Sequence, residues 1–148
     1  MSLFQAIDTA SSGLTAERLR MDVISDNLAN VNSTRTEEGG PYRRKIVTFE
    51  PRQKDKSFFP SLAHGDISTI NAGQGVRVTG IEEAEGEFRH IYEPEHPDAN
   101  DEGYVLKPNI DPAKEMVDMI TASRAYEANV TSISTAKKMF NEALNIAR

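Results

Sequence analysis

Three histidines, His64, His90 and His96, are the residues of this sequence best suited to bind a metal ion. No two of them have the i, i+4 spacing that places two ligands on one face of a helix. The chain contains no cysteine, which excludes a thiolate metal site, a disulfide framework and a cysteine nucleophile. We therefore expect the histidines to lie in loops or in solvent, and we predict neither a metal nor a cofactor.

Two short runs have part of the residue spacing of a known site but lack other residues that the site requires. Residues 98–103 (DANDEG) begin like a calcium loop, with oxygen ligands at the first, third and fifth positions and glycine at the sixth. The twelfth position is Asn109, where that loop needs a bidentate glutamate. Ser134 and Lys137 have the spacing of a serine nucleophile and its lysine base, but no partner motif follows them. We interpret the first run as an acidic turn and the second as part of a helix surface.

The middle of the chain is strongly acidic but offers no catalytic pair of carboxylates. Residues 82–102 contain nine carboxylates and one cation, Arg89. Such a surface repels phosphate, which argues against nucleic acid as a partner. The run is hydrophilic, so it lacks the desolvation that separates the pKa values of two catalytic acids. We expect no carboxylate in an apolar pocket anywhere in the chain, and we predict that the protein is not an enzyme.

Both ends of the chain carry apolar residues at an average spacing of 3.5, which is typical of coiled-coil helices. Small or polar residues interrupt this pattern at Ala10, Glu17, Ser123 and Lys137. The predicted N-terminal seam consists of Leu3, Ile7, Leu14, Met21, Ile24, Leu28 and Val31. The predicted C-terminal seam consists of Met116, Met119, Tyr126, Val130, Ile133, Phe140 and Leu144. These seams predict a long helix at each end of the chain.

The boundaries of the two helices follow from capping signals. The first helix is expected to run from about residue 2 to residue 31. Asn27, Asn30 and Asn32 are predicted to end it, since asparagine tolerates the left-handed conformation found at helix ends. Asp111 and Pro112 give an N-cap followed by proline at the first helical position, so the second helix begins there.

The segment between the helices reads as a small β part with irregular loops. Residues 42–50, 76–81 and 88–92 are rich in β-branched and aromatic side chains and predict three short strands of one small sheet. Residues 53–75 predict an irregular loop, and residues 94–108 a polar, turn-rich connection. Gly73, Gly75 and Gly80 precede neither a lysine nor a helix start, so we interpret them as turn and bulge glycines.

The predicted fold class is mainly α, with long terminal coiled-coil helices packed together and a short-stranded β-rich middle domain. The predicted division is an N-terminal axial helix over residues 1–34, a middle domain over 35–108 and a C-terminal axial helix over 109–148. Two such helices commonly bury each other as an antiparallel hairpin within one chain. The interrupted seams at the two ends favour a second arrangement, in which neighbouring molecules cover them. The sequence leaves both arrangements open.

Several motifs resemble those of the bacterial flagellar axial proteins, which build the rod and the hook. The shared rod and hook signature matches residues 11–14 (SSGL), Met21 and residues 25–33 (SDNLANVNS). Further runs resemble the proximal rod proteins in particular, namely residues 39–44 (GGPYRR), 96–99 (HPDA), 103–105 (GYV), 108–111 (PNID), 115–119 (EMVDM) and 123–129 (SRAYEAN). Residues 52–75 and 82–93 carry no matching motif. A different rod or hook subunit is the nearest alternative, and a helical-hairpin binding module is a more distant one.

This resemblance implies a structural subunit of the basal-body rod, whose terminal helices pack into an inner tube that transmits torque. It implies partners of three kinds, namely further copies of the chain in a ring, other rod proteins and the flagellar type III export apparatus. It also implies a location in the rod that crosses the cell envelope, reached without cleavage of a signal peptide. The N-terminal residues 1–14 lack the cationic start and apolar run of a cleaved signal. No stretch approaches the roughly 20 apolar residues of a membrane span, so we expect no membrane insertion.

Overall fold

A computed structural model describes residues 3–37, 39–52 and 74–146 of the chain. The elements follow the order α1 (Leu3–Ala29), β1 (Lys45–Pro51), β2 (Val76–Glu83), β3 (Arg89–Tyr92), β4 (Tyr104–Lys107) and α2 (Pro112–Ile146). Two long helices therefore enclose a small β part, which confirms the predicted fold class.

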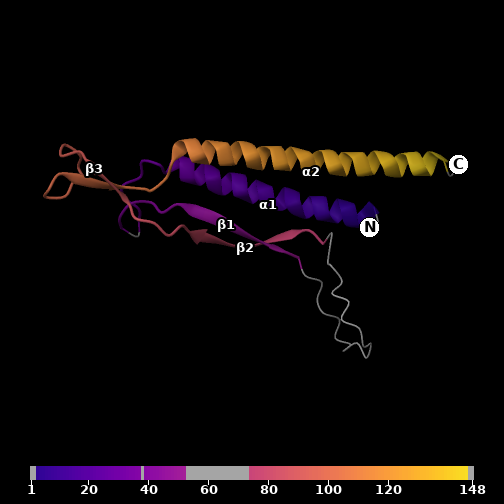
Figure 1. Cartoon of the computed structure of the whole chain (residues 1–148), viewed down its shortest axis with the longest axis horizontal. Helices are drawn as coiled ribbons and strands as arrows, with labels where there is room; N and C mark the ends of the chain where they lie inside the picture. The colour runs from indigo at the N-terminus through magenta and orange to yellow at the C-terminus, as the bar shows by residue number, and fades with distance from the viewer. Residues whose placement is uncertain (1–2, 38, 53–73, 147–148) are drawn as a thin grey trace, which may run out of the picture.

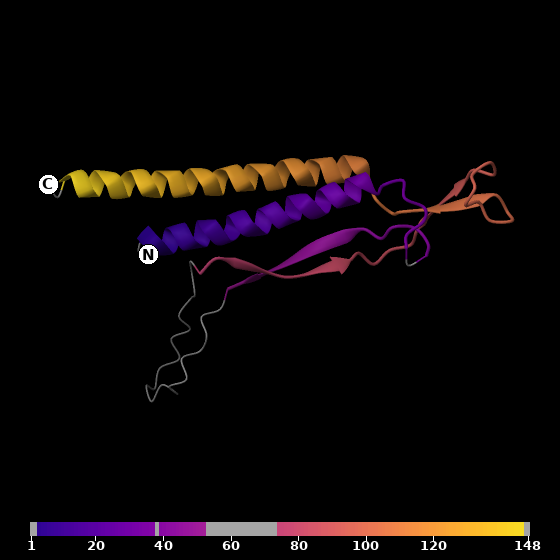
Figure 2. The ribbon, with the colours of Figure 1, turned by 180° about the vertical axis from the view of Figure 1, so that it is seen from behind.

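The molecule is elongated, and α1 is its middle layer. Figure 1 shows α2 running antiparallel to α1 along one side, while the β1–β2 ribbon follows α1 on the opposite side. The view from behind in Figure 2 shows the same order, with both chain ends at one end of the molecule and the β3–β4 ribbon projecting from the other. The closed hairpin of terminal helices, one of the two arrangements left open by the sequence, is present within the single chain.

The first helix ends close to the predicted position, but by a different mechanism. Among the described residues no side-chain-bearing residue has a positive φ, so the prediction that asparagines end the helix in the left-handed conformation is wrong. Instead, the carbonyl of Asp26 accepts from both the backbone N–H of Asn30 at 3.1 Å and its side-chain amide at 2.9 Å. Asn27 still lies inside the helix, and Asn32 is exposed after it.

The second helix begins where its capping signals predict. Pro112 is its first residue, and the carboxylate Oδ1 of Asp111 accepts a hydrogen bond from the backbone N–H of Ala113 at 3.0 Å. This bond satisfies one of the free N–H groups of the first turn. With 35 residues α2 is longer than α1, which has 27.

The strands form two separate ribbons, so the prediction of one three-stranded sheet is wrong. β1 pairs antiparallel with β2, and β3 pairs antiparallel with β4. The sequence missed β4, which lies in the segment predicted as a turn-rich connection. Gly80 lies opposite Thr48, where the register of β1 and β2 shifts, and this confirms its interpretation as a bulge glycine. Gly75, with a φ of +82°, directly precedes β2.

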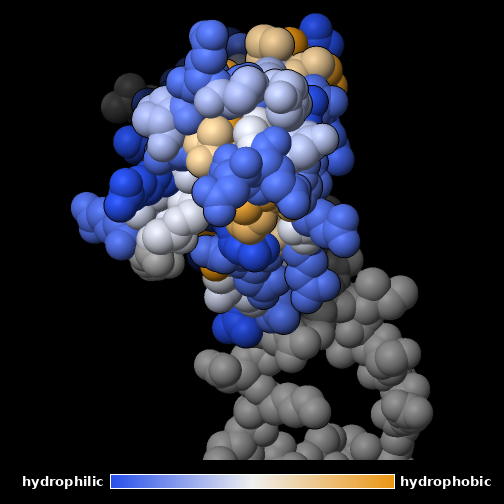
Figure 3. All heavy atoms as spheres, turned by 90° about the vertical axis from the view of Figure 1, so that its left-hand side faces the viewer, coloured by the Kyte–Doolittle hydropathy of each residue, from blue (hydrophilic) through white to orange (hydrophobic). Residues whose placement is uncertain are grey.

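The buried apolar residues are few and mostly small. Within the described residues they are Ala10, Ala16, Val23, Ile24, Val47, Val105, Ile110, Ala122 and Ala136. Figure 3 views the molecule along its long axis from the β3–β4 end, where the surface is mainly hydrophilic. Neither of the two helices, over the part of the chain described, is long and apolar enough to cross a membrane.

Candidate assembly surface and the adjacent polar cluster

The contact between α1 and α2 is built from small residues. Ala16, Ala122 and Ala136 are buried in it. A Cβ atom at Gly13 would lie 2.8 Å from the side-chain nitrogen of Asn129, so the helix backbones approach closely there. Because small residues fill the contact, many of the larger apolar residues of α2 remain outside it.

The predicted N-terminal seam faces the interior only in part. Ile24 is buried, and Ile7, Leu14, Met21, Leu28 and Val31 are partly buried. The side chain of Leu3 falls outside the described part of the structure. The seam of α1 is thus largely occupied by α2 and the β1–β2 ribbon.

The predicted C-terminal seam divides into two groups. Met119, Tyr126 and Ile133 are partly buried against α1. The other four members are exposed, at 51% for Met116, 44% for Val130, 41% for Phe140 and 54% for Leu144. Phe140 makes an edge-to-face contact with Phe4, with ring centroids 6.3 Å apart. The exposed members leave apolar area available to another molecule.

Sequence reasoning missed two further apolar residues on the outer side of α2. Val117 is 62% exposed and Ile120 is 55% exposed. Together with Met116 they form an apolar patch, here called the outer ridge, one helical turn long and facing away from α1. Their i, i+1, i+4 spacing was a usable signal, since Val117 and Ile120 extend a helix face from the seam residue Met116.

A buried polar cluster lies where α1, the start of β1 and α2 meet, and it has Asn27 at its centre. Its side-chain oxygen accepts from the backbone N–H of Lys45 at 2.9 Å and from the Tyr42 hydroxyl at 3.2 Å. Its side-chain nitrogen donates to the carbonyl of Lys45 at 2.8 Å and to Glu115 Oε2 at 3.2 Å. The amide thus satisfies its full hydrogen-bonding capacity while joining α1, the start of β1 and α2. Asn27 is a structural link, whereas the sequence suggested only a helix-end role.

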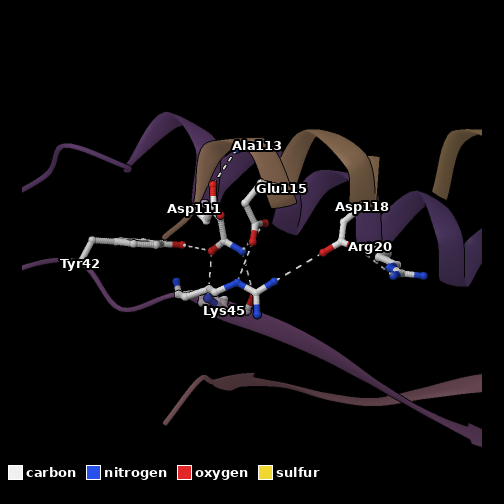
Figure 4. Close-up of polar contacts among 9 residues, drawn as sticks. Arg20, Tyr42, Lys45, Asp111, Ala113, Glu115 and Asp118 are labelled. Atoms are coloured by element: carbon white, nitrogen blue, oxygen red, sulfur yellow. Dashed lines mark hydrogen bonds and ion pairs between the residues drawn. The ribbon is translucent and has the colours of Figure 1, made fainter. Parts of the chain in front are cut away.

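Glu115 is the second member of this cluster, as Figure 4 shows. Its side chain is 1% exposed, and its Oε1 accepts from Arg44 Nε at 2.6 Å. Arg44 also lies 3.7 Å from Asp118, which in turn lies 4.0 Å from Arg20. Segments distant in sequence remove Glu115 from solvent, and the groups that contact its carboxylate are the polar side chains of Arg44 and Asn27. Both of its oxygens accept hydrogen bonds, so its side chain links Arg44 to Asn27. The expectation that no carboxylate lies in an apolar pocket stays a prediction.

Tyr42 titrates in an altered environment at the edge of the cluster. Burial raises the pKa of its hydroxyl above the ordinary value, and the nearby carboxylates of Asp26, Glu115 and Glu83 raise it further. The neutral phenol is therefore favoured, and in that form it donates to Asn27.

A groove of about 250 Å³ opens beside the cluster, between α1, β1 and the first turns of α2. Its apolar lining includes Val23 and Ile24, and at its edge Ile46 and Phe49 are 39% and 38% exposed. The remaining lining residues are Arg20, Asn27, Arg44, Lys45, Val47, Glu115 and Asp118.

The motifs considered first as chemical sites lie on the surface or outside the description. His90 is exposed on β3, and Nδ1 of His96 accepts from the backbone N–H of Asp98 at 3.1 Å. Residues 98–103 form the turn between β3 and β4, as the interpretation of an acidic turn predicted. Ser134 and Lys137 are exposed on α2. His64 and Gly73 lie outside the described residues.

Two family models match the two ends of the chain. Residues 7–35 match the model described as flagella basal body rod protein. Residues 101–146 match the model described as the C-terminal part of the flagellar basal body rod FlgEFG protein. The matches cover most of α1 and of α2, together with β4.

Curated relatives match over the whole length. The flagellar basal-body rod protein FlgC of Bacillus subtilis is 46% identical over 152 residues, with 100% of both chains covered. FlgC of Borreliella burgdorferi is 49% identical over 154 residues, covering 99% of this chain and 98% of the relative. FlgC of Escherichia coli is 36% identical over 148 residues, with 100% of both chains covered. These similarities confirm the resemblance seen in the terminal motifs, and the chain belongs to the FlgC family of flagellar basal-body rod proteins.

Proposed function

We propose that this protein is a structural subunit of the proximal rod of the flagellar basal body. It joins further copies of itself in a ring, contacts other rod proteins and transmits motor torque through its terminal helices. The observation that carries this proposal is the set of large apolar residues on α2 that its own chain leaves exposed, from Met116 to Leu144.

In the proposed rod the exposed face of α2 meets a different surface of the next copy, which makes the contact heterologous. Contacts of that kind close into a ring or continue into a helical filament. The apolar side chains of this face are already about half buried in the subunit, so covering the rest of each contributes about 1 kcal/mol. Several such contacts in parallel at every subunit give the stiffness that a torque-bearing shaft requires.

We further propose export through the flagellar type III apparatus, in an unfolded state and without signal cleavage. The small apolar core supports this route, because a core of mostly alanine and valine side chains gives a modest unfolding free energy. In this account residues 1–34 and 109–148 form the assembly unit and residues 35–108 an outer domain. The proposed role requires no catalytic residue, metal or cofactor.

Two alternatives have some support. Another axial subunit would share the terminal helices, but the full-length similarity to FlgC proteins favours the proximal rod. A helical-hairpin binding module would use the closed α1–α2 pair that the structure contains. A rod subunit works as part of a polymer, whereas a binding module works as a monomer.

Deletion of the gene, with purification of basal bodies from the complemented strain, tests the proposal. We expect the deletion strain to be non-motile and to lack rod, hook and filament. Mass spectrometry of basal bodies from the complemented strain is expected to detect the chain at several copies per particle. A motile deletion strain, or basal bodies with complete rods that lack the chain, would overturn the proposal.

A further inference from the structure

We propose that the outer ridge of α2, made of Met116, Val117 and Ile120, inserts into the groove between α1, β1 and α2 of a second copy of this chain. This inference rests on the proposed function and specifies which two surfaces of neighbouring subunits meet. The occupant of the groove is therefore an identical subunit, bound through a surface different from the groove itself.

The apolar ridge can contact the apolar part of the groove lining, which is Val23, Ile24, Ile46, Val47 and Phe49. The ridge residues are 51%, 62% and 55% exposed, so each has a large apolar area open to solvent. The groove offers about 250 Å³, which in the separate subunit is room for about eight water molecules at about 30 Å³ each. Its lining includes Val23, and Phe49 is partly exposed at its edge. Replacing water on both surfaces by apolar contact favours their association.

The surfaces cannot meet within one molecule. Glu115 and Asp118 of α2 line the groove, and the buried Ala122 packs beside them against α1. The ridge lies on the other side of the same helix, so a second copy has to supply it. Each copy then contributes its ridge to one neighbour and its groove to another, and the contact repeats around an axis.

The charges beside the two surfaces are also complementary. The groove carries Asp118, 30% exposed, and Arg20, 34% exposed, which form a long pair at 4.0 Å. Beyond the ridge, α2 presents Arg124 and Glu127 in exposed positions. Within the described residues neither of these two makes an ion pair with its own chain. In the proposed contact Arg124 approaches Asp118 of the neighbour, and Glu127 approaches Arg20 of the neighbour.

The direction of the helices allows both pairs to form together. Figure 1 shows that α2 runs toward the end with the two chain termini, while α1 runs away from it. From Ile120, Arg124 and Glu127 lie about 6 Å and about 10 Å toward the terminal end, at 1.5 Å per residue. From Asn27, which lines the groove, Arg20 lies about 10 Å in the same direction. Neighbours related by rotation about the long axis keep this direction. The ridge can therefore enter the groove in the same arrangement that brings the charged residues of the two copies together.

Cysteine cross-linking in assembled rods tests the contact, since the natural chain has no cysteine. One copy of the gene encodes Ile120→Cys and a second copy in the same cell encodes Phe49→Cys. Each chain carries one cysteine and the two variants mix at random, so we expect oxidation of purified basal bodies to convert up to about half of the chain to a species of twice its 16.4 kDa mass. Disulfide formation requires Cα atoms within about 7 Å, so the product reports direct contact. The matched control replaces Ile120→Cys by Thr135→Cys, exposed on the same helix about 22 Å farther along, and is expected to give no product.

Other outcomes separate this inference from the proposed function. Product from Ile120→Cys alone would mean that two ridges meet, and basal bodies that contain both variants but give no product would mean that other surfaces meet. Either result overturns the ridge and groove contact and leaves the rod assignment intact.

If the cysteine variants do not assemble, charge-reversal variants test the same contact. Glu127→Arg and Arg20→Glu are each expected to reduce swimming at least tenfold, and the double variant to restore it. Failure of the double variant to restore swimming would also overturn the contact.

Discussion

Nε of Arg44 lies 2.6 Å from Oε1 of Glu115, joining two positions 71 residues apart in the chain. Arg44 precedes β1, and Glu115 lies in the first turn of α2. The pair therefore attaches the middle of the chain to the C-terminal helix, while Asn27 attaches both to α1. Buried charges need this kind of pairing, since removing one partner leaves the other unpaired away from water.

Glu115→Ala is expected to lower the free energy of unfolding by about 3 kcal/mol, because it leaves Arg44 without its closest partner and Asn27 without one of its two acceptors. Urea unfolding followed by helix circular dichroism measures the change. The control is Glu50→Ala, which removes a pair with Arg77 at 3.4 Å between side chains that are 56% and 65% exposed. It is expected to change stability by less than about 0.5 kcal/mol. Equal losses in the two variants would contradict the structural role of Glu115.

Gly75→Ala is expected to cost about 2–3 kcal/mol of stability, from backbone strain and a steric clash together. Gly75 has a φ of +82°, and an added Cβ would overlap Ser12 Oγ, which accepts from the N–H of Val76 at 3.1 Å. Gly40→Ala separates the two effects, since Gly40 has a φ of +86° with open space around it. It is expected to cost about 1 kcal/mol, from backbone strain alone. Urea unfolding of both variants gives the comparison, and a loss at Gly40 as large as at Gly75 would show that the contact with Ser12 has no importance.

Stability is expected to fall in alkaline solution through Tyr42. The pKa of Tyr42 is raised in the folded state, chiefly by burial, so the folded protein holds the phenol proton more tightly than the unfolded chain. The stabilisation of the folded state by the protonated Tyr42 is complete below the ordinary pKa of about 10 and is lost as the pH rises through the folded pKa. Tyr42→Phe removes it, together with about 1 kcal/mol from the hydrogen bond to Asn27. The stability difference between wild type and Tyr42→Phe, measured from pH 8 upward, should shrink above about pH 10. A constant difference would contradict this role.

Ala122→Leu tests the close contact of the two helices. Ala122 is 0% exposed, so three added heavy atoms have no room and are expected to cost about 1–3 kcal/mol. Ala128→Leu introduces the same side chain at an exposed position of α2 and is expected to change stability by less than about 0.5 kcal/mol. Thermal unfolding of both variants provides the comparison. An Ala122→Leu variant as stable as the wild type would show that the helix contact is loose.

The features predicted correctly from the sequence depend on residues that lie close together in the chain. The 3.5-residue period predicted both helices, and the pair Asp111 and Pro112 predicted the start of α2 because the cap is made by adjacent residues. The bulge at Gly80 also followed from a local signal. Strand pairing did not, since the partner of β3 is a strand of only four residues (YVLK) between two polar segments, too short to show a period.

The polar cluster shows why part of the site could not be predicted from the sequence. Glu115 is the acidic residue of the first turn of α2, a common position for a carboxylate beside a helix N-terminus, so nothing local indicated its burial. Its environment depends on Arg44 and Asn27, which reach it only after the hairpin closes. The seam residues divide into covered and exposed groups for the same reason. Periodicity identifies a helix face, but the size of the residues at the contact decides how much of that face remains open.

Motility of a strain that carries Met116→Asp, compared with one that carries Glu95→Ala, tests the central claim most directly. Met116 is 51% exposed in the separate subunit, so the substitution is expected to change its unfolding free energy by less than about 0.5 kcal/mol. In an assembled rod the added carboxylate would be buried without a partner at every subunit, at a cost of several kcal/mol each. Export of both variants is verified first. The account predicts exported, folded Met116→Asp protein without rods or swimming, beside a motile Glu95→Ala strain. A swimming Met116→Asp strain beside a paralysed Glu95→Ala strain would contradict it.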